Sequence, residues 1–559
     1  PHCRTVITQT TNLQFPELSP SCGSLALVCW SSHVGLGVRR RSRKVLRRFV
    51  ETNRTQRSRP PRMDCFALQN IWGTRVGAFV IGHWYVCTCV CVCVCDALFP
   101  IRGTPTNKLR IVVTFFFWIV LLLSFLVHNT HLKALSASGH AVPPSAIWKF
   151  GKSLALPTNA LKEIAIGNHE MGDEGVVALC EPLHEQGGNL EKIDLAYKGI
   201  SQRGMVAIGQ TFYQSLQLRE LNLSRNPNIG NEGIQQWRSA CNSLRGGEED
   251  NHSRCFEALD VLDLSECGIG PTGMDALASM LRAKKKLRIL KLHRNPLGSA
   301  SAGSLSHLLV GDPSTTYSKI QSLHLGHCEL GDDGLATLTQ VANPRTGLEV
   351  LDLSDNGIGH EGMTYFAKSL HDGCWSTLVE LSMAGNPLGP EGVKALANAL
   401  ENNGGNHHHH HGGEKTQITG NASVEILDMS RTQCGIDGVQ WLWKCTGLVK
   451  LRLFDNALGS GLEELVSTRS SNNGSKEEDE TLLFSSCSRL QELDLGGNNA
   501  PSTALVALLD AIAAGKTKLR VLELGGNQGG ENVEEAIKRL QRKIPNLDVA
   551  RDRPHGSHS

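Results

Sequence analysis

The sequence lacks the short motifs that mark most enzymes and cofactor-binding domains. It has no Gly-x-Ser-x-Gly nucleophile motif and no other catalytic constellation. It has no Cys-x-x-Cys pair of the kind that holds zinc. Gly151-Lys152-Ser153 is not a phosphate loop, because Ala146 stands where the upstream glycine is needed. We therefore predict no catalytic residue, no metal site and no cofactor, and the sequence shows no nucleotide-binding module.

The chain also has little net charge, but this balance conceals two unlike parts. The formal charge of the whole chain is +2. Residues 1–110 hold 16 Lys/Arg and 4 Asp/Glu, whereas the remainder holds 40 and 50. Contact with phosphate groups needs a positive surface, so the acidic remainder argues against a nucleic-acid partner.

What the sequence does contain is an internal repeat over residues 161–549. The clearest copies are LDVLDLSECGIGPTG from Leu259, LEVLDLSDNGIGHEG from Leu348 and LVELSMAGNPLGPEG from Leu378. The step from Leu259 to Leu287 is 28 residues. Aligning this frame gives about twelve repeats, whose first positions are Leu161, Leu190, Leu218, Leu259, Leu287, Ile320, Leu348, Leu378, Val424, Leu448, Leu490 and Leu519.

Each part of the frame predicts a local structure. The segment LxxLxL predicts a short parallel strand with its leucines pointing inward. The ninth position holds an amide, thiol or hydroxyl side chain, which can form hydrogen bonds with the loop backbone of successive coils. The residues at this position are Asn226, Asn295, Asn356, Asn386, Asn456, Asn498, Asn527, Cys267, Cys328 and Thr432. A glycine at the fifteenth position precedes a helical run, in Gly175, Gly204, Gly273, Gly334, Gly362, Gly392 and Gly438. The fold class is therefore α/β: a leucine-rich-repeat solenoid, or horseshoe, with strands on the concave side and helices on the convex side.

This period, with Asn or Cys at position nine and glycine at position fifteen, resembles the ribonuclease-inhibitor subfamily of leucine-rich repeats over about residues 160–549. NOD-like receptor tails and the Ran GTPase-activating protein share it. The resemblance implies non-catalytic recognition of a protein partner. Without a nucleotide-binding module we do not expect a complete NOD-like receptor. The Ran activator requires an arginine and an asparagine in early loops, for which Arg225 and Asn226 are the candidates, although an asparagine there is also the ladder residue of most repeats.

The outward position between the second and third leucines describes the concave floor. Strands lie about 4.8 Å apart, so these side chains should form one row. We predict that its charged and histidine members bind a protein partner: Asp194, Asp263, Lys291, His324, Asp352, Asp428, Arg452, Asp494 and Glu523. Six of them are acidic and two are basic, which favours a basic or mixed-charge partner. The alternative is a solvated face that keeps the solenoid soluble.

The pattern of histidines in the sequence does not predict a metal site. His293, His324, His327 and Cys328 fall on neighbouring strands, but without metal-ligand spacing, and Cys328 occupies an inward ladder position. His407–His411 lies in a low-complexity stretch and predicts a loop. Three insertions, at about 245–256, 402–423 and 467–486, should project from one rim, either as a binding edge or as tolerated expansions.

Residues 111–127, IVVTFFFWIVLLLSFLV, carry no charge, and their length lies at the lower edge of the range of about 17–25 residues that spans a membrane. Basic residues precede them, so the positive-inside rule predicts a single-pass protein with luminal or extracellular repeats. The repeats would then act as an adaptor or a receptor-like ectodomain. Small residues at 134–138 also allow a cleaved signal peptide. Sequons at Asn251, Asn421 and Asn473 agree with that placement. The ladder cysteines favour reduced thiols and a cytoplasmic scaffold instead.

The ends of the chain complete the domain division. We expect residues 1–110 to be unstructured or to derive from non-coding sequence translated in error, since the Val–Cys alternation of Val86–Cys95 is what a TG dinucleotide tract encodes. The division is then 1–110, a candidate membrane or signal segment at 111–127, a linker at 128–155, the repeats at 156–552 and a tail at 553–559.

Overall fold

The computed structural model describes residues 108–110 and 131–551, apart from 187, 214, 244–255, 283, 285, 311–318, 341–346, 402–423, 464–488 and 516. The chain divides into two units, Pro1–Cys89 and Val90–Ser559, and all described residues belong to the second. The candidate membrane segment, the Val–Cys run, the five-histidine run, the three sequons and nearly all of the insertions lie outside the described residues.

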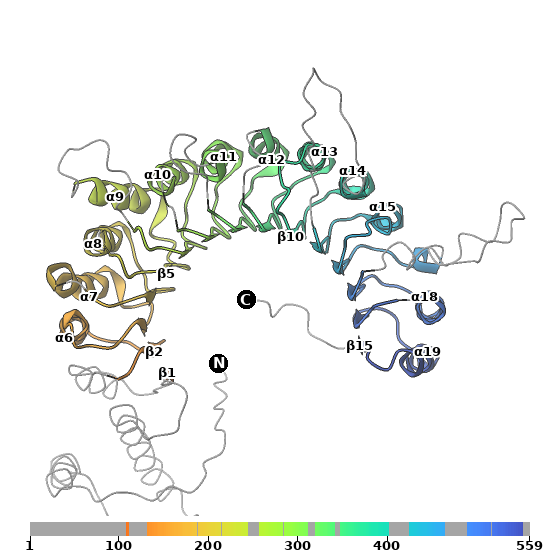
Figure 1. Ribbon diagram of the computed structural model, residues 1–559, viewed down its shortest axis with the longest axis horizontal. Helices are drawn as coiled ribbons and strands as arrows, with labels where there is room; N and C mark the ends of the chain where they lie inside the picture. Colours follow the sequence, from red (N-terminus) through yellow and green to blue (C-terminus); the bar gives the residue numbers. More distant parts are fainter. Residues whose placement is uncertain are drawn as a thin grey trace, which may run out of the picture. The chain divides into compact units, whose positions relative to one another are not determined.

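The described strands form a single parallel sheet in which every strand pairs with its neighbours in chain order. The sheet has 15 strands, and Figure 1 shows them lining the inner side of the arc. Their bounds are β1 Lys108–Arg110, β2 Ala134–Ser138, β3 Glu163–Gly167, β4 Lys192–Asp194, β5 Glu220–Asn222, β6 Val261–Asp263, β7 Ile289–Lys291, β8 Ser322–His324, β9 Val350–Asp352, β10 Glu380–Ser382, β11 Ile426–Asp428, β12 Lys450–Arg452, β13 Glu492–Asp494, β14 Val521–Glu523 and β15 Asp548–Ala550.

Helices cover the outer side of the same sheet (Figure 1). From α6 to α15 each helix packs against the next, and α18 packs against α19. Their bounds are α6 Pro144–Ala155, α7 Gly172–Gln186, α8 Gln202–Phe212, α9 Gly230–Ser243, α10 Pro271–Leu281, α11 Ala302–Val310, α12 Gly331–Gln340, α13 His360–His371, α14 Gly389–Glu401, α15 Gly435–Leu442, α18 Ser502–Ala514 and α19 Glu531–Lys543; a short 3₁₀ helix, η2 Ser299–Ser301, precedes α11. The horseshoe predicted from the repeat frame is therefore confirmed.

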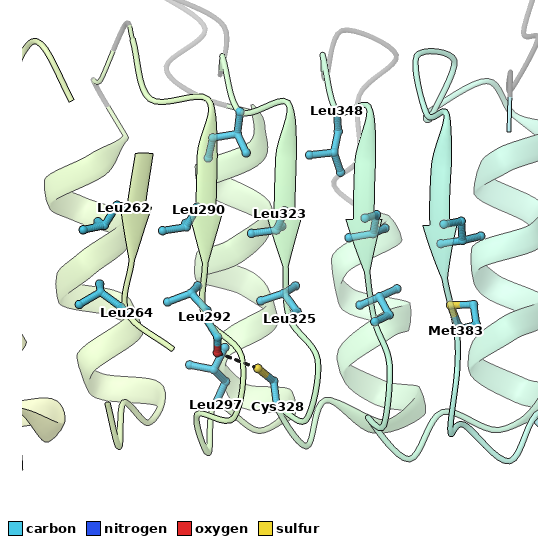
Figure 2. Close-up of a cluster of buried hydrophobic side chains, with 14 of the residues drawn as sticks. Leu262, Leu264, Leu290, Leu292, Leu297, Leu323, Leu325, Cys328, Leu348 and Met383 are labelled. Atoms are coloured by element: carbon cyan, nitrogen blue, oxygen red, sulfur yellow. Dashed lines mark hydrogen bonds between the residues drawn. The ribbon is translucent and has the colours of Figure 1, made fainter. Parts of the chain in front are cut away.

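The core is the layer of leucines between the strands and the helices. Figure 2 shows Leu262, Leu290 and Leu323 stacked from one repeat to the next, with Leu264, Leu292 and Leu325 in the row beside them. All six side chains are fully buried. Burying a leucine side chain contributes about 1.5–3 kcal/mol, so a period that places these residues inward in every repeat is sufficient reason for the coils to stack.

The predicted ladder is present, and its asparagines join adjacent coils. Asn356 Nδ2 donates to the carbonyl oxygens of Leu325 (2.8 Å) and Leu353 (2.9 Å), and its Oδ1 accepts from the backbone N–H of Cys328 (3.1 Å). Where the ladder residue is cysteine, its thiol forms one of these inter-coil hydrogen bonds: Cys328 Sγ donates to Leu292 O at 3.2 Å (Figure 2). These bonds satisfy buried backbone groups that would otherwise remain unpaired.

The fifteenth-position glycines let one helix cap the next. At the start of α10, the backbone N–H groups of Gly270, which precedes the helix, and of Gly273 both donate to Asn231 Oδ1 of α9, at 2.7 and 2.9 Å. A Cβ at Gly273 would lie only 2.5 Å from that oxygen. The same contact recurs where Asp173 of α7 accepts from Gly204 of α8 (3.0 Å). The glycine is thus needed for close approach between successive helices.

The structure differs from the expected linker at 128–155. These residues contain β2 and α6, which extend the sheet and the helical layer by one coil. Leu132, Leu135 and Ala137 are buried at the frame positions of the leucines. The expectation of a linker is therefore wrong; the frame is degenerate here because alanine replaces the third leucine.

Candidate partner-binding surface on the concave face

The third residue of each three-residue strand points to the concave face, and the sheet register aligns these residues side by side. Asp263 pairs with Lys291, Lys291 with His324 and His324 with Asp352. The remaining strands continue the series. We call this series the floor row: Asp194, Asn222, Asp263, Lys291, His324, Asp352, Ser382, Asp428, Arg452, Asp494 and Glu523. The structure therefore brings together all nine side chains that the sequence analysis selected.

The aspartates of the floor row also have a structural task that the sequence analysis did not foresee. One carboxylate oxygen accepts from the backbone N–H two residues later, as in Asp352 with Ser354 (2.9 Å) and Asp428 with Ser430 (3.0 Å). Asn222 makes the same bond to Ser224 (3.0 Å). Such turns suit Asp and Asn equally. The turn explains why short acceptor side chains recur here, but it does not explain why most of them carry a charge.

The basic members of the row are held by acidic neighbours. Arg452 Nη1 lies 3.2 Å from Asp428 Oδ2, and Lys291 Nζ lies 3.9 Å from Asp263 Oδ2. Because of these pairs, the sign of the side-chain charge changes several times along the floor row. Because they are partly exposed, each contributes little to stability, typically about 0–1 kcal/mol. Their effect is to hold the charged side chains of the floor row in fixed directions.

A second row follows the floor row, three positions further along each repeat, and the sequence analysis missed it. These residues all have a left-handed backbone, as in Arg225 (φ 60°) and Arg294 (φ 54°). An inter-coil hydrogen bond imposes that conformation: Arg225 N donates to Ser265 O at 2.7 Å. We call it the loop row: Tyr197, Arg225, Glu266, Arg294, His327, Asp355, Arg431 and Asp455. The signal that could have revealed it is the eighth frame position, immediately before the ladder residue.

The loop row contains a shallow hollow near the N-terminal end of the repeats. Tyr197, Arg225, Glu266 and Arg294 line a space of about 510 Å³. Tyr197 is 59% exposed and stacks on His169, with ring centroids 5.6 Å apart. Glu266 lies between the two arginines, 3.5 Å from Arg225 and 4.0 Å from Arg294. Exposed tyrosine and arginine are residue types that dominate binding energy at protein interfaces.

The pair proposed for small-GTPase regulation is divided by the ladder. Asn226 is buried, donates to Leu195 O (2.9 Å) and accepts from the backbone N–H groups of Lys198 (2.9 Å) and Ile200 (3.1 Å). Only Arg225 of the pair is therefore accessible to a partner.

Three side chains of the concave face converge without a sequence motif. His293, two residues beyond the floor position of β7, lies beside His324 of β8 and Asp352 of β9. Burial lowers the pKa of His324 to about 4 and also lowers the pKa of His293, which favours the neutral form of both imidazoles. Cys328 points into the core, as expected, and burial raises its pKa to about 12.

Comparison with known proteins gives this geometry a family. The Leucine Rich repeat family matches residues 160–180, 215–235, 259–278, 318–338, 347–367 and 376–397. The ribonuclease inhibitor of Sus scrofa is 26% identical over 434 residues, which cover 71% of this chain and 90% of that protein. The chain is a leucine-rich-repeat solenoid whose repeats resemble those of the ribonuclease inhibitors.

Other relatives share the repeats with additional sequence of their own. The ribonuclease inhibitor of Mus musculus is 27% identical over 350 residues, or 55% of this chain and 73% of that protein. NACHT, LRR and PYD domains-containing protein 12 of Mus musculus is 27% identical over 301 residues, which are 49% of this chain but only 26% of that protein. The similarity to the latter is thus confined to a part of its length.

The expected placement as a single-pass membrane protein with luminal or extracellular repeats is corrected. Among the residues that the structure describes, no helix is long and apolar enough to cross a membrane. The relatives above are ribonuclease inhibitors and a NACHT, LRR and PYD protein, and none of these names denotes a membrane receptor. Residues 111–127, on which the expectation rested, lie outside the described residues.

Proposed function

We propose that this leucine-rich-repeat protein is a non-catalytic binder of a protein partner, and that the floor row carries the contact. The supporting observation is the register of the sheet, which sets eleven floor side chains from eleven repeats next to one another. A solenoid that offers a long continuous surface commonly binds through its concave side. Rigid spacing also lowers the entropy lost on binding.

The charge of the floor row supports a basic or mixed-charge partner. Aspartates tied at one oxygen by the backbone are fixed in direction, so their second oxygens form an ordered set of acceptors. Such an arrangement would accelerate encounter with a complementary surface and select its register. Tyr197 and Arg294 of the loop row would add apolar and cationic contacts at one edge.

The relatives suggest the first partner class to test. The names of two relatives state that they inhibit a ribonuclease, so a ribonuclease is a reasonable partner for this chain as well. The proposed setting is a cytoplasmic scaffold. Cys180, Cys267, Cys328 and Cys434 are buried and carry free thiols, which suits a reducing compartment.

The decisive experiment removes charge from the floor without disturbing its turns. Asp194→Asn, Asp263→Asn and Asp428→Asn are combined in one variant, because Asn222 shows that asparagine keeps the turn bond. A panel of basic proteins that includes ribonucleases is screened by surface plasmon resonance for a partner of the unaltered protein. We expect the variant to bind that partner at least about tenfold more weakly, with a weaker dependence on salt.

The matched control removes three charges from the convex side, through Asp275→Asn, Asp333→Asn and Asp437→Asn in exposed positions of α10, α12 and α15. This control has the same net charge as the floor variant. We expect it to retain affinity. Equal weakening in both variants would mean that only net charge matters and would refute recognition by the floor row, as would a partner whose affinity neither variant changes.

A further inference from the structure

His293, His324 and Asp352 present three metal-binding atoms from three consecutive repeats. Their ligand atoms all lie within 4.8 Å of one another, and His293 Nδ1 is 3.6 Å from Asp352 Oδ2. The two imidazole centroids are 5.2 Å apart. Ligands about 2.0–2.2 Å from a tetrahedral zinc ion are themselves separated by about 3.3–3.5 Å. Small side-chain rotations would therefore bring all three atoms to a shared ion.

Neighbouring groups already orient two of the three ligands. Asp352 Oδ1 accepts from Ser354 N (2.9 Å), which leaves Oδ2 facing His293. Ser322 Oγ is 2.8 Å from His324 Nε2, and this contact orients the imidazole ring. Bonds of this kind from outside the coordination shell fix ligand geometry in metal sites.

The backbone makes room for this approach at one glycine. A Cβ at Gly326 would lie 2.9 Å from His293 Nδ1, 3.4 Å from Asp352 Oδ2 and 2.6 Å from Ser354 Oγ. A larger residue would have to displace the ligand atoms or the serine beside them. Gly326 therefore keeps open the space in which the donors meet.

We propose that His293, His324 and Asp352 form a zinc site on the concave floor, with a fourth position open to water or to a donor atom of another molecule. Two imidazoles and a carboxylate suit zinc, which takes three protein ligands where one position stays open. Magnesium and calcium prefer six or more oxygen ligands, which this set does not offer. Asp263 offsets the nearby charge of Lys291, at 3.9 Å. The site goes beyond the proposed partner recognition and needs no partner to form.

The test measures zinc binding in the full chain. Its background replaces His407 to His411 and the cysteines of Val86–Cys95 with serine, because both runs would also bind the ion. Isothermal titration calorimetry with Zn²⁺ should show a single strong site. His293→Ala, His324→Ala and Asp352→Asn should each weaken binding by at least about tenfold, and Ser322→Ala, which alters only positioning, by about 10–100-fold. Circular dichroism checks that each variant is folded.

The matched control is His327→Ala, which removes an imidazole of the same repeat that pairs with Asp355 (3.2 Å) and is not one of the three proposed ligands. Its zinc affinity should be unchanged. Binding of Co²⁺ in place of Zn²⁺, to protein whose floor row is unaltered, gives a readout that does not depend on the floor variants. We expect the visible absorption of four-coordinate Co²⁺ without a thiolate charge-transfer band. The proposal is overturned if zinc binding survives His293→Ala and His324→Ala, if Co²⁺ shows six-coordinate or thiolate spectra, or if Mg²⁺ competes as well as Zn²⁺.

Discussion

At the scale of single residues, the ladder shows how one buried position accommodates different chemistries. Asparagine satisfies both a donor and an acceptor need of the adjacent coils, whereas Cys328 supplies a thiol donor only. In the repeat that starts at Leu190 the ladder residue is Lys198, which is buried and donates from Nζ to Ser138 Oγ at 2.7 Å. Burial lowers the pKa of Lys198, which indicates that its charged form is destabilised there.

We therefore expect Lys198→Asn to raise the free energy of unfolding, by about 1 kcal/mol at pH 7, since the amide can bond the coil backbone and no ammonium is buried. The unfolded lysine binds its proton up to about pH 10.5, and the folded one loses it at lower pH. Stability of the unaltered protein should rise with pH through that interval. The advantage of Lys198→Asn should shrink accordingly.

Urea unfolding at neutral pH and near pH 10.5 measures both effects. Lys133→Asn, at an exposed position, is the control. It should change neither the free energy of unfolding at neutral pH nor the dependence of that free energy on pH. An advantage of Lys198→Asn that grows with pH would contradict the assignment of the cost to a buried charge.

At the scale of elements, the frame predicts the strands and helices wherever leucine fills its positions. The strand of LDVLDL and the helix that follows it appear as β6 and α10. The inter-repeat cap is less accessible to prediction, because Asn231 and Gly273 are 42 residues apart and meet only when the helices pack. The coil of β2 and α6 was missed for a related reason: Ala137 is too small to show the leucine pattern, although it is buried like a leucine.

The cap makes a specific prediction about helix glycines. Gly273→Ala should destabilise the protein by about 1–3 kcal/mol, because its Cβ would come within 2.5 Å of Asn231 Oδ1 and 3.1 Å of Asn231 Cα. Gly303→Ala is the matched change in α11, where an added Cβ meets no atom within 4 Å. It should be neutral or stabilising by up to about 1 kcal/mol. Thermal unfolding of the two variants decides; equal effects would show that helix propensity and not the inter-repeat contact governs these positions.

At the scale of the whole molecule, the register of the sheet places residues with the same repeat-frame position side by side in space. The floor row could be predicted from sequence because a repeat period maps directly onto neighbouring strands. The cluster of His293, His324 and Asp352 could not, since it combines the seventh frame position of one repeat with the fifth of the next two. A search by spacing sees no motif there, and only side-chain geometry across three strands reveals it.

The same one-dimensional order determines how the molecule should lose stability. Helix α19 buries Val533, Ala536, Ile537 and Leu540 and turns a charged face outward, which is the pattern of a capping repeat. It packs against α18, whose buried residues include Leu505, Leu508, Leu509 and Ile512. Truncation after Gly530 would expose this surface at a cost of up to about 1.5–3 kcal/mol for each leucine or isoleucine fully uncovered.

Because each repeat contacts only its neighbours, that loss should be graded along the chain. Hydrogen exchange in the truncated protein should accelerate most in β14 and α18, less in β12 and α15, and not at all in α8 (Figure 1). Removal of residues 552–559 alone is the control and should leave exchange unchanged. A uniform acceleration from α6 to α18 would instead mean that the arc unfolds as one cooperative unit, and the nearest-neighbour description would then be wrong for this solenoid.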